Sequence, residues 1–214
     1  MSMLKRIVSG ALCCLLLCLS FAGCSKKALG DSPVPLETVT QNDQGNRVTF
    51  EFGLPAGWGS GSPYDYAIEA VNIKKYAGEE EPALRLGISN YRRVGWSFSE
   101  EDEKRMDDLF QGKTEAYEQH INKLMEKTNT KVDHFQFQYY KGTYGTIAEV
   151  QYTYTYQGEP FHEIRCYRED IPYMVAGAFK DTNELSSGDI VPWVADSLKV
   201  TEHFQTQSDT SQEQ

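Results

Sequence analysis

The chain has 214 residues, with 31 acidic and 21 basic side chains and a formal net charge of −10. Surfaces that bind nucleic-acid phosphates carry net positive charge, so this balance argues against a nucleic-acid partner. The length is sufficient for one domain with a proper hydrophobic core.

Residues 1–23 have the three zones of a secretory signal peptide. The basic pair Lys5-Arg6 is followed by a nearly unbroken apolar run of 13 residues and then by small residues up to Cys24. The run is too short to span a membrane, for which a helix needs about 20 residues. The ending Phe21-Ala22-Gly23-Cys24 resembles the lipobox of bacterial lipoproteins, which implies a diacylglycerol on the Cys24 thiol and cleavage before it. The alternative is an ordinary cleaved signal with Cys24 as an incidental thiol.

A lipid on Cys24 implies a location on the extracytoplasmic face of a cell membrane. In a Gram-negative cell, Ser25 after Cys24 resembles a signal for the outer membrane. Cleavage removes Lys5 and Arg6 and leaves a formal charge of −12, so we expect the lipid, not the acidic body, to hold the protein on the membrane. Cys166 is then the one cysteine left to the folded part, and we expect it to be buried as a small apolar residue.

The remaining chain divides by composition into a tether, a domain and a tail. Residues 24–45 are polar, contain two prolines and show no apolar period, which predicts a flexible tether. Residues 205–214 contain no apolar residue and are predicted to be disordered. Residues 46–204 are predicted to form a single domain.

The first half of this domain combines strands with a long helix. Val48, Phe50 and Phe52 alternate with polar residues and predict a half-buried strand. A Gly- and Ser-rich loop is expected over residues 57–63, followed by strands over 64–76 and 83–91. Ser99 precedes a run of acidic residues, which is typical of a helix N-terminus. Apolar residues at helical spacing continue to position 125, and Gly112 is expected to bend or split the helix.

The second half changes to the two-residue period of strands. Strands are predicted around residues 135–139, 148–156, 161–168 and 171–179, and a turn at residues 157–160 joins the second to the third. A short helix is predicted from Ile190 to Leu198, with Pro192 tolerated in its first turn. Consecutive strands with segregated helices predict an α+β domain, an antiparallel β-sheet flanked by helices.

Three segments of this domain resemble Mog1/PsbP-like domains. They are the strand-Pro-small-Trp opening Phe50–Trp58, the Gly-led hairpin Gly142–Tyr156 and the closing helix Trp193–Val200. The resemblance covers about residues 46–202 and implies an α/β/α sandwich around an antiparallel sheet. It also implies a binding or assembly module rather than an enzyme, and it transfers no binding residue to this chain.

No pattern in the sequence predicts a catalytic, metal or cofactor site. The string Gly59-Ser60-Gly61-Ser62 lacks the strand-to-helix context of a nucleophile elbow, and this glycine-rich stretch lacks the Lys-Ser/Thr ending of a P-loop. His134 and His162 are placed to face one another across the sheet, but two ligands fall short of the three or four that most metal sites need. We therefore expect a protein that is not an enzyme, with no metal and no cofactor.

Tyrosines crowd the predicted sheet and suggest two interpretations, a sheet core with wet edges or a binding face. The candidate binding face consists of Trp58, Trp96, Tyr140, Tyr152, Tyr154 and Tyr156. The first hypothesis is a lipoprotein that binds an envelope protein or serves as an assembly module. The alternative is a carrier of a small ligand, such as a sugar, peptide or lipid, or an accessory to an envelope enzyme. A carrier is expected to have one deep apolar pocket with converging polar groups, and a protein binder an exposed aromatic patch without a pocket.

Overall fold

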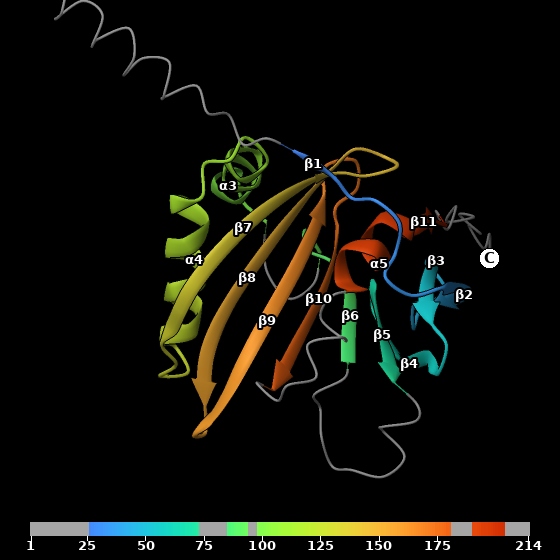
Figure 1. Ribbon diagram of the computed structural model, residues 1–214, viewed down its shortest axis with the longest axis horizontal. Coiled ribbons are helices and arrows are strands. Elements are labelled where there is room, and N and C mark those ends of the chain that lie inside the picture. The colour runs from blue at the N-terminus through green and yellow to red at the C-terminus, as the bar shows by residue number, and fades with distance from the viewer. Residues whose placement is uncertain (1–25, 73–84, 94–97, 181–189, 204–214) are drawn as a thin grey trace, which may run out of the picture.

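The computed structural model describes residues 26–72, 85–93, 98–180 and 190–203. These residues form an α+β structure with an eight-stranded sheet, a three-stranded sheet and three α-helices (Figure 1). The signal peptide, Cys24, Trp96 and the tail 205–214 lie outside the described residues. The predicted α+β class is confirmed.

The large sheet has the strand order β1-β7-β8-β9-β10-β6-β5-β4. Its neighbouring strands are antiparallel, except that β1 runs parallel to β7. The central meander of four long strands, β7 to β10, agrees with the strands predicted from the two-residue period. The strands are β1 (Lys27–Ala28), β4 (Trp58–Tyr64), β5 (Ala67–Asn72), β6 (Arg85–Asn90), β7 (Val132–Lys141), β8 (Thr146–Tyr156), β9 (Glu159–Arg168) and β10 (Tyr173–Lys180).

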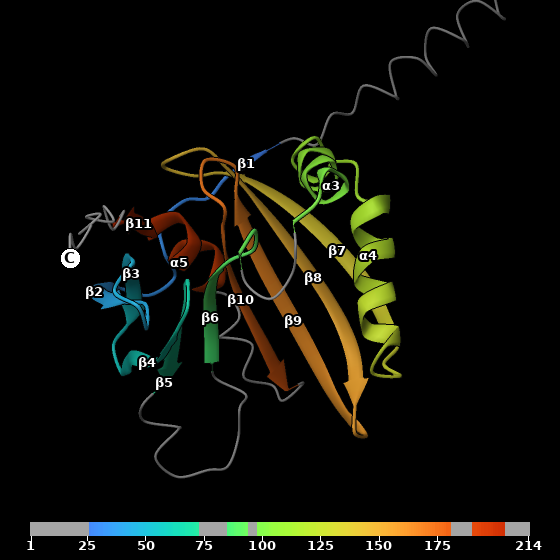
Figure 2. The same cartoon turned by 180° about the vertical axis from the view of Figure 1, so that it is seen from behind.

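The small sheet has the order β11-β3-β2, with β2 at Leu36–Asn42, β3 at Val48–Pro55 and β11 at Lys199–Glu202. The helices are α3 (Glu100–Phe110), α4 (Glu115–Glu126) and α5 (Val191–Ser197). Figures 1 and 2 show α3 and α4 beside β7 and β8, and α5 beside the small sheet.

The sequence explains where α3 begins and why it separates from α4. Ser99 and Asp102 form a capping box, in which each side chain accepts a hydrogen bond from the backbone N–H of the other. Gly112 has a φ of 80°, a left-handed conformation that glycine adopts without strain and that ends the helical path. The predicted split of the helix at Gly112 is confirmed.

Two apolar cores lie on opposite faces of the large sheet because side chains alternate along each strand. On β9, Ile164 and Cys166 belong to the core formed with α5 and β3, whereas Tyr167 belongs to the core formed with α3 and α4. Cys166 is fully buried and free, as predicted, and burial raises the pKa of its thiol well above the usual value. Both faces of the sheet are therefore covered in part by helices.

Two predictions made from composition are wrong. Residues 26–45 are not a flexible tether, because β1 pairs with β7 and β2 pairs with β3 from Thr49 to Pro55. Residues 57–63 are not a loop, because most of them form the edge strand β4, whose register shifts between Ser60 and Pro63. In both segments backbone pairing stabilises a strand that has little apolar content, and an edge position with a bulge accommodates proline. Strand β11 was not predicted.

Candidate functional site

A cavity of about 540 Å³ lies between the helices α3 and α4 and the face of β6, β9 and β10. Its walls combine aromatic and aliphatic side chains with basic ones. They are Ser89, Tyr91, Phe98, Asp102, Arg105, Met106, Tyr117, His120, Ile121, Lys123, Leu124, Lys127, Arg165, Tyr167 and Met174.

Beyond the helices, the sheet carries small side chains on the same face as the cavity. Helix α3 packs on β8 and α4 packs on β7. On β10, Ala176 lies opposite Arg165 of β9, and on β6, Gly87 lies opposite Ala176. A Cβ atom placed on Gly87 would come no closer than 3.9 Å to its nearest neighbour, the carbonyl oxygen of Ala176. These small residues thus leave open space on the sheet beside the long side chain of Arg165.

A buried tyrosine pair forms the inner wall of the cavity. The hydroxyl oxygens of Tyr117 on α4 and Tyr167 on β9 lie 2.7 Å apart, and the two residues are only 2% and 3% exposed. Their rings meet edge to face at 5.8 Å, and the ring of Tyr91 meets that of Tyr167 in the same way at 5.6 Å. Burial and the neighbouring Tyr167 raise the pKa of Tyr117 well above the usual value, so the Tyr117 hydroxyl stays neutral.

Arg165 lies on the floor of the cavity with its side chain 21% exposed. Its Nε binds the Glu163 carboxylate at 2.5 Å, and its guanidinium lies 5.6 Å from the centre of the Tyr152 ring. The two terminal amino groups of Arg165 make no hydrogen bond to any other described residue. The guanidinium therefore has donors available for a bound molecule.

The helices add further positive charge around His120. Arg105 on α3 forms an ion pair with Asp102, while Lys123 lies on α4 and Lys127 directly follows its last residue. Burial and the nearby Arg105 lower the pKa of His120 to about 4, with Arg165 and Lys127 acting in the same direction and Asp102 opposing them. His120 is therefore neutral at pH 7.

The site is cationic in an acidic protein. Its two arginines and two lysines face two carboxylates, Asp102 and Glu163, each of which is paired with one of the arginines. The balance of this cluster is +2, whereas the whole chain carries −10.

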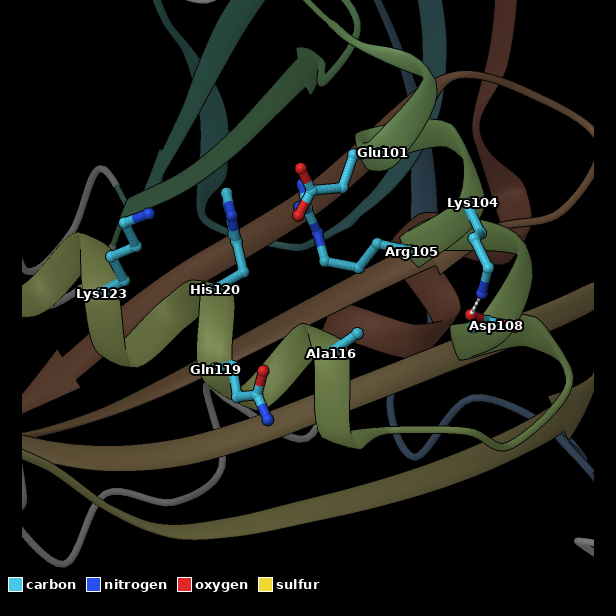
Figure 3. Close-up of a pocket in the computed structure, with 8 residues that line it drawn as sticks. All are labelled: Glu101, Lys104, Arg105, Asp108, Ala116, Gln119, His120 and Lys123. Carbon is cyan, nitrogen blue, oxygen red and sulfur yellow. Dashed lines mark hydrogen bonds and ion pairs between the residues drawn. The ribbon is translucent and has the colours of Figure 1, made fainter.

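A smaller hollow of about 260 Å³ lies between α3 and α4 and shares Arg105, His120 and Lys123 with the cavity. Figure 3 shows His120 and Lys123 projecting from α4 on the side where Arg105 projects from α3. The remaining lining residues, among them the ion-paired Lys104 and Asp108, are mostly polar. This hollow adjoins the mouth of the larger cavity and adds the carboxylates of Glu101 and Asp108, the ammonium group of Lys104 and few apolar contacts.

The structure does not bring the residues of the candidate binding face predicted from the sequence together on one surface. Tyr152 is 1% exposed and belongs to the core under α3 and α4, and Tyr154 is half-buried against the same core. Tyr156 is 45% exposed at the end of β8. These three residues share one face of the strand, but burial makes the first of them a core residue.

The other members of that prediction lie elsewhere. Trp58 and Tyr140 pack against the core on the opposite face of the sheet, and Trp96 lies outside the described residues. Alternation along the strands separates the two groups, so the predicted set contains residues of both faces. For much of the set, the sheet-core interpretation of the aromatic residues fits the structure.

The important cavity residues were not singled out from the sequence. In the sequence, Arg165 lies within a predicted strand and Tyr117 lies among the apolar residues at helical spacing, so neither residue belongs to a recognisable motif. The available signal was the alternation of Glu163, Arg165 and Tyr167, which places charged and aromatic side chains on one face of β9.

The histidines of the described residues do not form a metal centre. His162 forms a hydrogen bond with Gln151 at 3.0 Å, and His134 occupies an irregular position of β7 with a φ of 56°. Within the described ranges, no three His, Cys, Asp or Glu residues are grouped to hold a metal ion.

Comparisons with known proteins identify a distant structural neighbour. No protein-family model matches the sequence, and no curated protein matches it. Among solved structures, the chain is similar to the solution structure of cyanobacterial PsbP (CyanoP) from Synechocystis sp. PCC 6803, with 9% identity and a TM-score of 0.43. The match covers 80% of this chain and 96% of that one. In the part of the chain that the structure describes, no helix is long and apolar enough to span a membrane.

Proposed function

We propose that this chain is a lipid-anchored extracytoplasmic protein, without catalytic activity, that holds a small molecule in the cavity between α4 and the large sheet. The observation that carries the proposal is the cavity itself. Its volume of about 540 Å³ suits a small organic ligand, and it combines apolar walls with the converging polar groups of Arg165 and the Tyr117–Tyr167 pair. These are the features expected of a carrier.

A protein-binding or assembly role has less support. The large apolar residues that are exposed in the described part of the chain are Val34, Tyr64, Tyr144 and Tyr156. Tyr144 precedes β8 and Tyr156 ends it, so these two lie roughly 35 Å apart along an extended strand. Such scattered residues are ordinary on soluble proteins and do not mark a recognition patch.

The lipid anchor is supported by the sequence of residues 1–24. We propose that Cys24 carries the diacylglycerol, and that the domain belongs to the Mog1/PsbP type of α/β/α sandwich on the strength of the segments Phe50–Trp58, Gly142–Tyr156 and Trp193–Val200. Growth with radioactive palmitate should label the wild-type protein but not a Cys24→Ala variant. Equal labelling of both proteins would rule out Cys24 as the acceptor.

The ligand-binding role is tested by purifying the lipidated protein from its own membranes and recording native mass spectra. We expect a small molecule to be retained by the wild type and lost from Ser89→Phe, because Ser89 lies on the cavity floor. Ser60→Phe, on the exposed surface of the edge strand β4, is the matched control and should retain the molecule. A stoichiometric protein partner that persists in Ser89→Phe, with no small molecule in any form, would support the assembly role instead.

A further inference from the structure

We infer that the ligand of this cavity is an amphipathic organic anion, whose acidic group binds the terminal amino groups of Arg165 and whose apolar body lies against the aromatic wall. The inference rests on the proposed function, since it names the class of molecule that the same cavity accepts.

The position of Arg165 is the first observation. A partly buried guanidinium loses some of its favourable contact with water, and ion pairing and hydrogen bonding replace that contact. Glu163 replaces part of this through Nε alone. The two terminal amino groups have no hydrogen-bond partner among the described residues and point from the same guanidinium plane. A carboxylate, sulfonate or phosphate accepts two parallel hydrogen bonds from such a pair.

The electrostatics of the mouth favour the same sign of ligand charge. Lys123 belongs to both hollows, and no carboxylate of another described residue lies within ion-pair distance of its Nζ. His120 stands between this lysine and Arg105, and its pKa is lowered by burial and by the neighbouring cations. Basic side chains outnumber carboxylates in the lining of the cavity, so its field favours an incoming anion.

The apolar walls specify the rest of the molecule. Tyr91 and Phe98 lie on one side of the cavity, Ile121 and Leu124 of α4 on another, and Met174 of β10 on the floor. Thioether and aromatic groups adapt to flat or flexible hydrocarbon. A small inorganic anion would leave these surfaces in contact with water, so the site fits an acid that carries an apolar body.

Two fluorescent probes separate charge from shape. Anilinonaphthalene sulfonate and N-phenylnaphthylamine share one aromatic skeleton, and only the first carries a sulfonate. Titrations use the full mature protein and the double variant Glu163→Gln/Arg165→Gln, which removes both charges of the pair and so avoids leaving one buried charge alone. The matched control is Glu51→Gln/Lys199→Gln, which removes an exposed ion pair of the small sheet.

We expect the wild type and the control to bind the sulfonate at least about tenfold more tightly than the neutral probe, as a charge-assisted hydrogen-bonded pair provides. The Glu163→Gln/Arg165→Gln variant should lose most of the preference for the sulfonate, keeping only what the remaining lysines of the cavity provide, and Ser89→Phe should bind neither probe. Equal affinities for the two probes in the wild type, lost in Ser89→Phe, would overturn the anion inference and leave the proposed function intact. Binding of both probes that Ser89→Phe does not alter would place them outside the cavity and overturn both.

Discussion

The hydrogen bond between Tyr117 and Tyr167 joins α4 to the sheet and can be measured by a double-mutant cycle. Tyr117→Phe removes one hydroxyl and leaves that of Tyr167 buried without this partner, and Tyr167→Phe does the reverse. Because both residues are at most 3% exposed, water does not readily replace the lost partner.

The expected magnitudes follow from the cost of a buried polar group without a partner. Each single substitution should lower the free energy of unfolding by about 1–3 kcal/mol. For a domain of this size, that corresponds to a fall in Tm of about 2–12 °C. The double variant Tyr117→Phe/Tyr167→Phe leaves neither hydroxyl unpaired, so it should cost less than the sum of the two single variants.

Urea unfolding followed by circular dichroism measures all four proteins. The coupling energy should be clearly different from zero, and the m-values should agree, since the surface exposed on unfolding is nearly the same. Additive costs, each below about 0.5 kcal/mol, would refute the reasoning, because they would mean that water in the cavity satisfies either hydroxyl alone.

Further predictions concern the side chains of the α3 cap, His120 and Cys166. Ser99→Ala should destabilise the protein by about 1 kcal/mol through loss of the α3 cap. Hydrogen bonds from Ser99 and the ion pair with Arg105 lower the pKa of Asp102. The stability advantage of the wild type over Asp102→Asn should therefore shrink as pH falls below 3.8. The pKa of His120 is about 4 in the folded protein and 6.5 in its ordinary state, so between these pH values the unfolded chain takes up the proton first and stability falls as pH falls. Urea titrations at several pH values should show that His120→Gln lacks this pH-dependent loss of stability. NMR titration of His120 should find no midpoint near 6.5. The Cys166 thiol should resist a thiol reagent in the native protein and react fully in urea, because it is buried and its pKa is raised; rapid native labelling at this position would contradict the burial.

The elements with a strong local signal were predictable from the sequence. Alternation of apolar residues located β3 and the long strands of the meander, and Ser99 with its following acidic residues located the start of α3. These features depend on neighbours in the chain, which the sequence displays directly. Strand β2 has a weak pattern of its own and forms because it pairs along β3, so its position depends on a partner strand that periodicity does not reveal.

The candidate site depends on contacts that periodicity does not reveal. Tyr117 and Tyr167 are separated by 50 positions and meet only after α4 packs on the sheet. The open space beside Arg165 depends on Gly87, which is distant from Arg165 in sequence and separated from Arg165 by β10 in the sheet. Counting aromatic residues on neighbouring strands could not distinguish a core tyrosine such as Tyr152 from a cavity residue such as Tyr167, since both lie under the helices.

The pairing of β1 changes what a lipid on Cys24 would do to the position of the domain. Lys27 pairs with Tyr140, and the Leu29 N–H donates to the Lys141 carbonyl at 3.4 Å. Lys27 lies three positions after Cys24, a span of at most about 10 Å, so the anchor would hold the end of the sheet near β1 and α3 close to the membrane (Figure 1).

Limited trypsin digestion of the membrane-bound protein tests this arrangement. Cleavage after the lysines at positions 26 and 27 should release the wild-type domain slowly, because Lys26 also donates a hydrogen bond to Thr146 Oγ1 at 2.7 Å. Leu29→Pro removes the donor to Lys141 while keeping both cleavage sites, and it should be released faster. Equally rapid release of the two proteins would mean that this segment opens freely, as the flexible tether predicted from its composition would, and that the domain stands away from the bilayer.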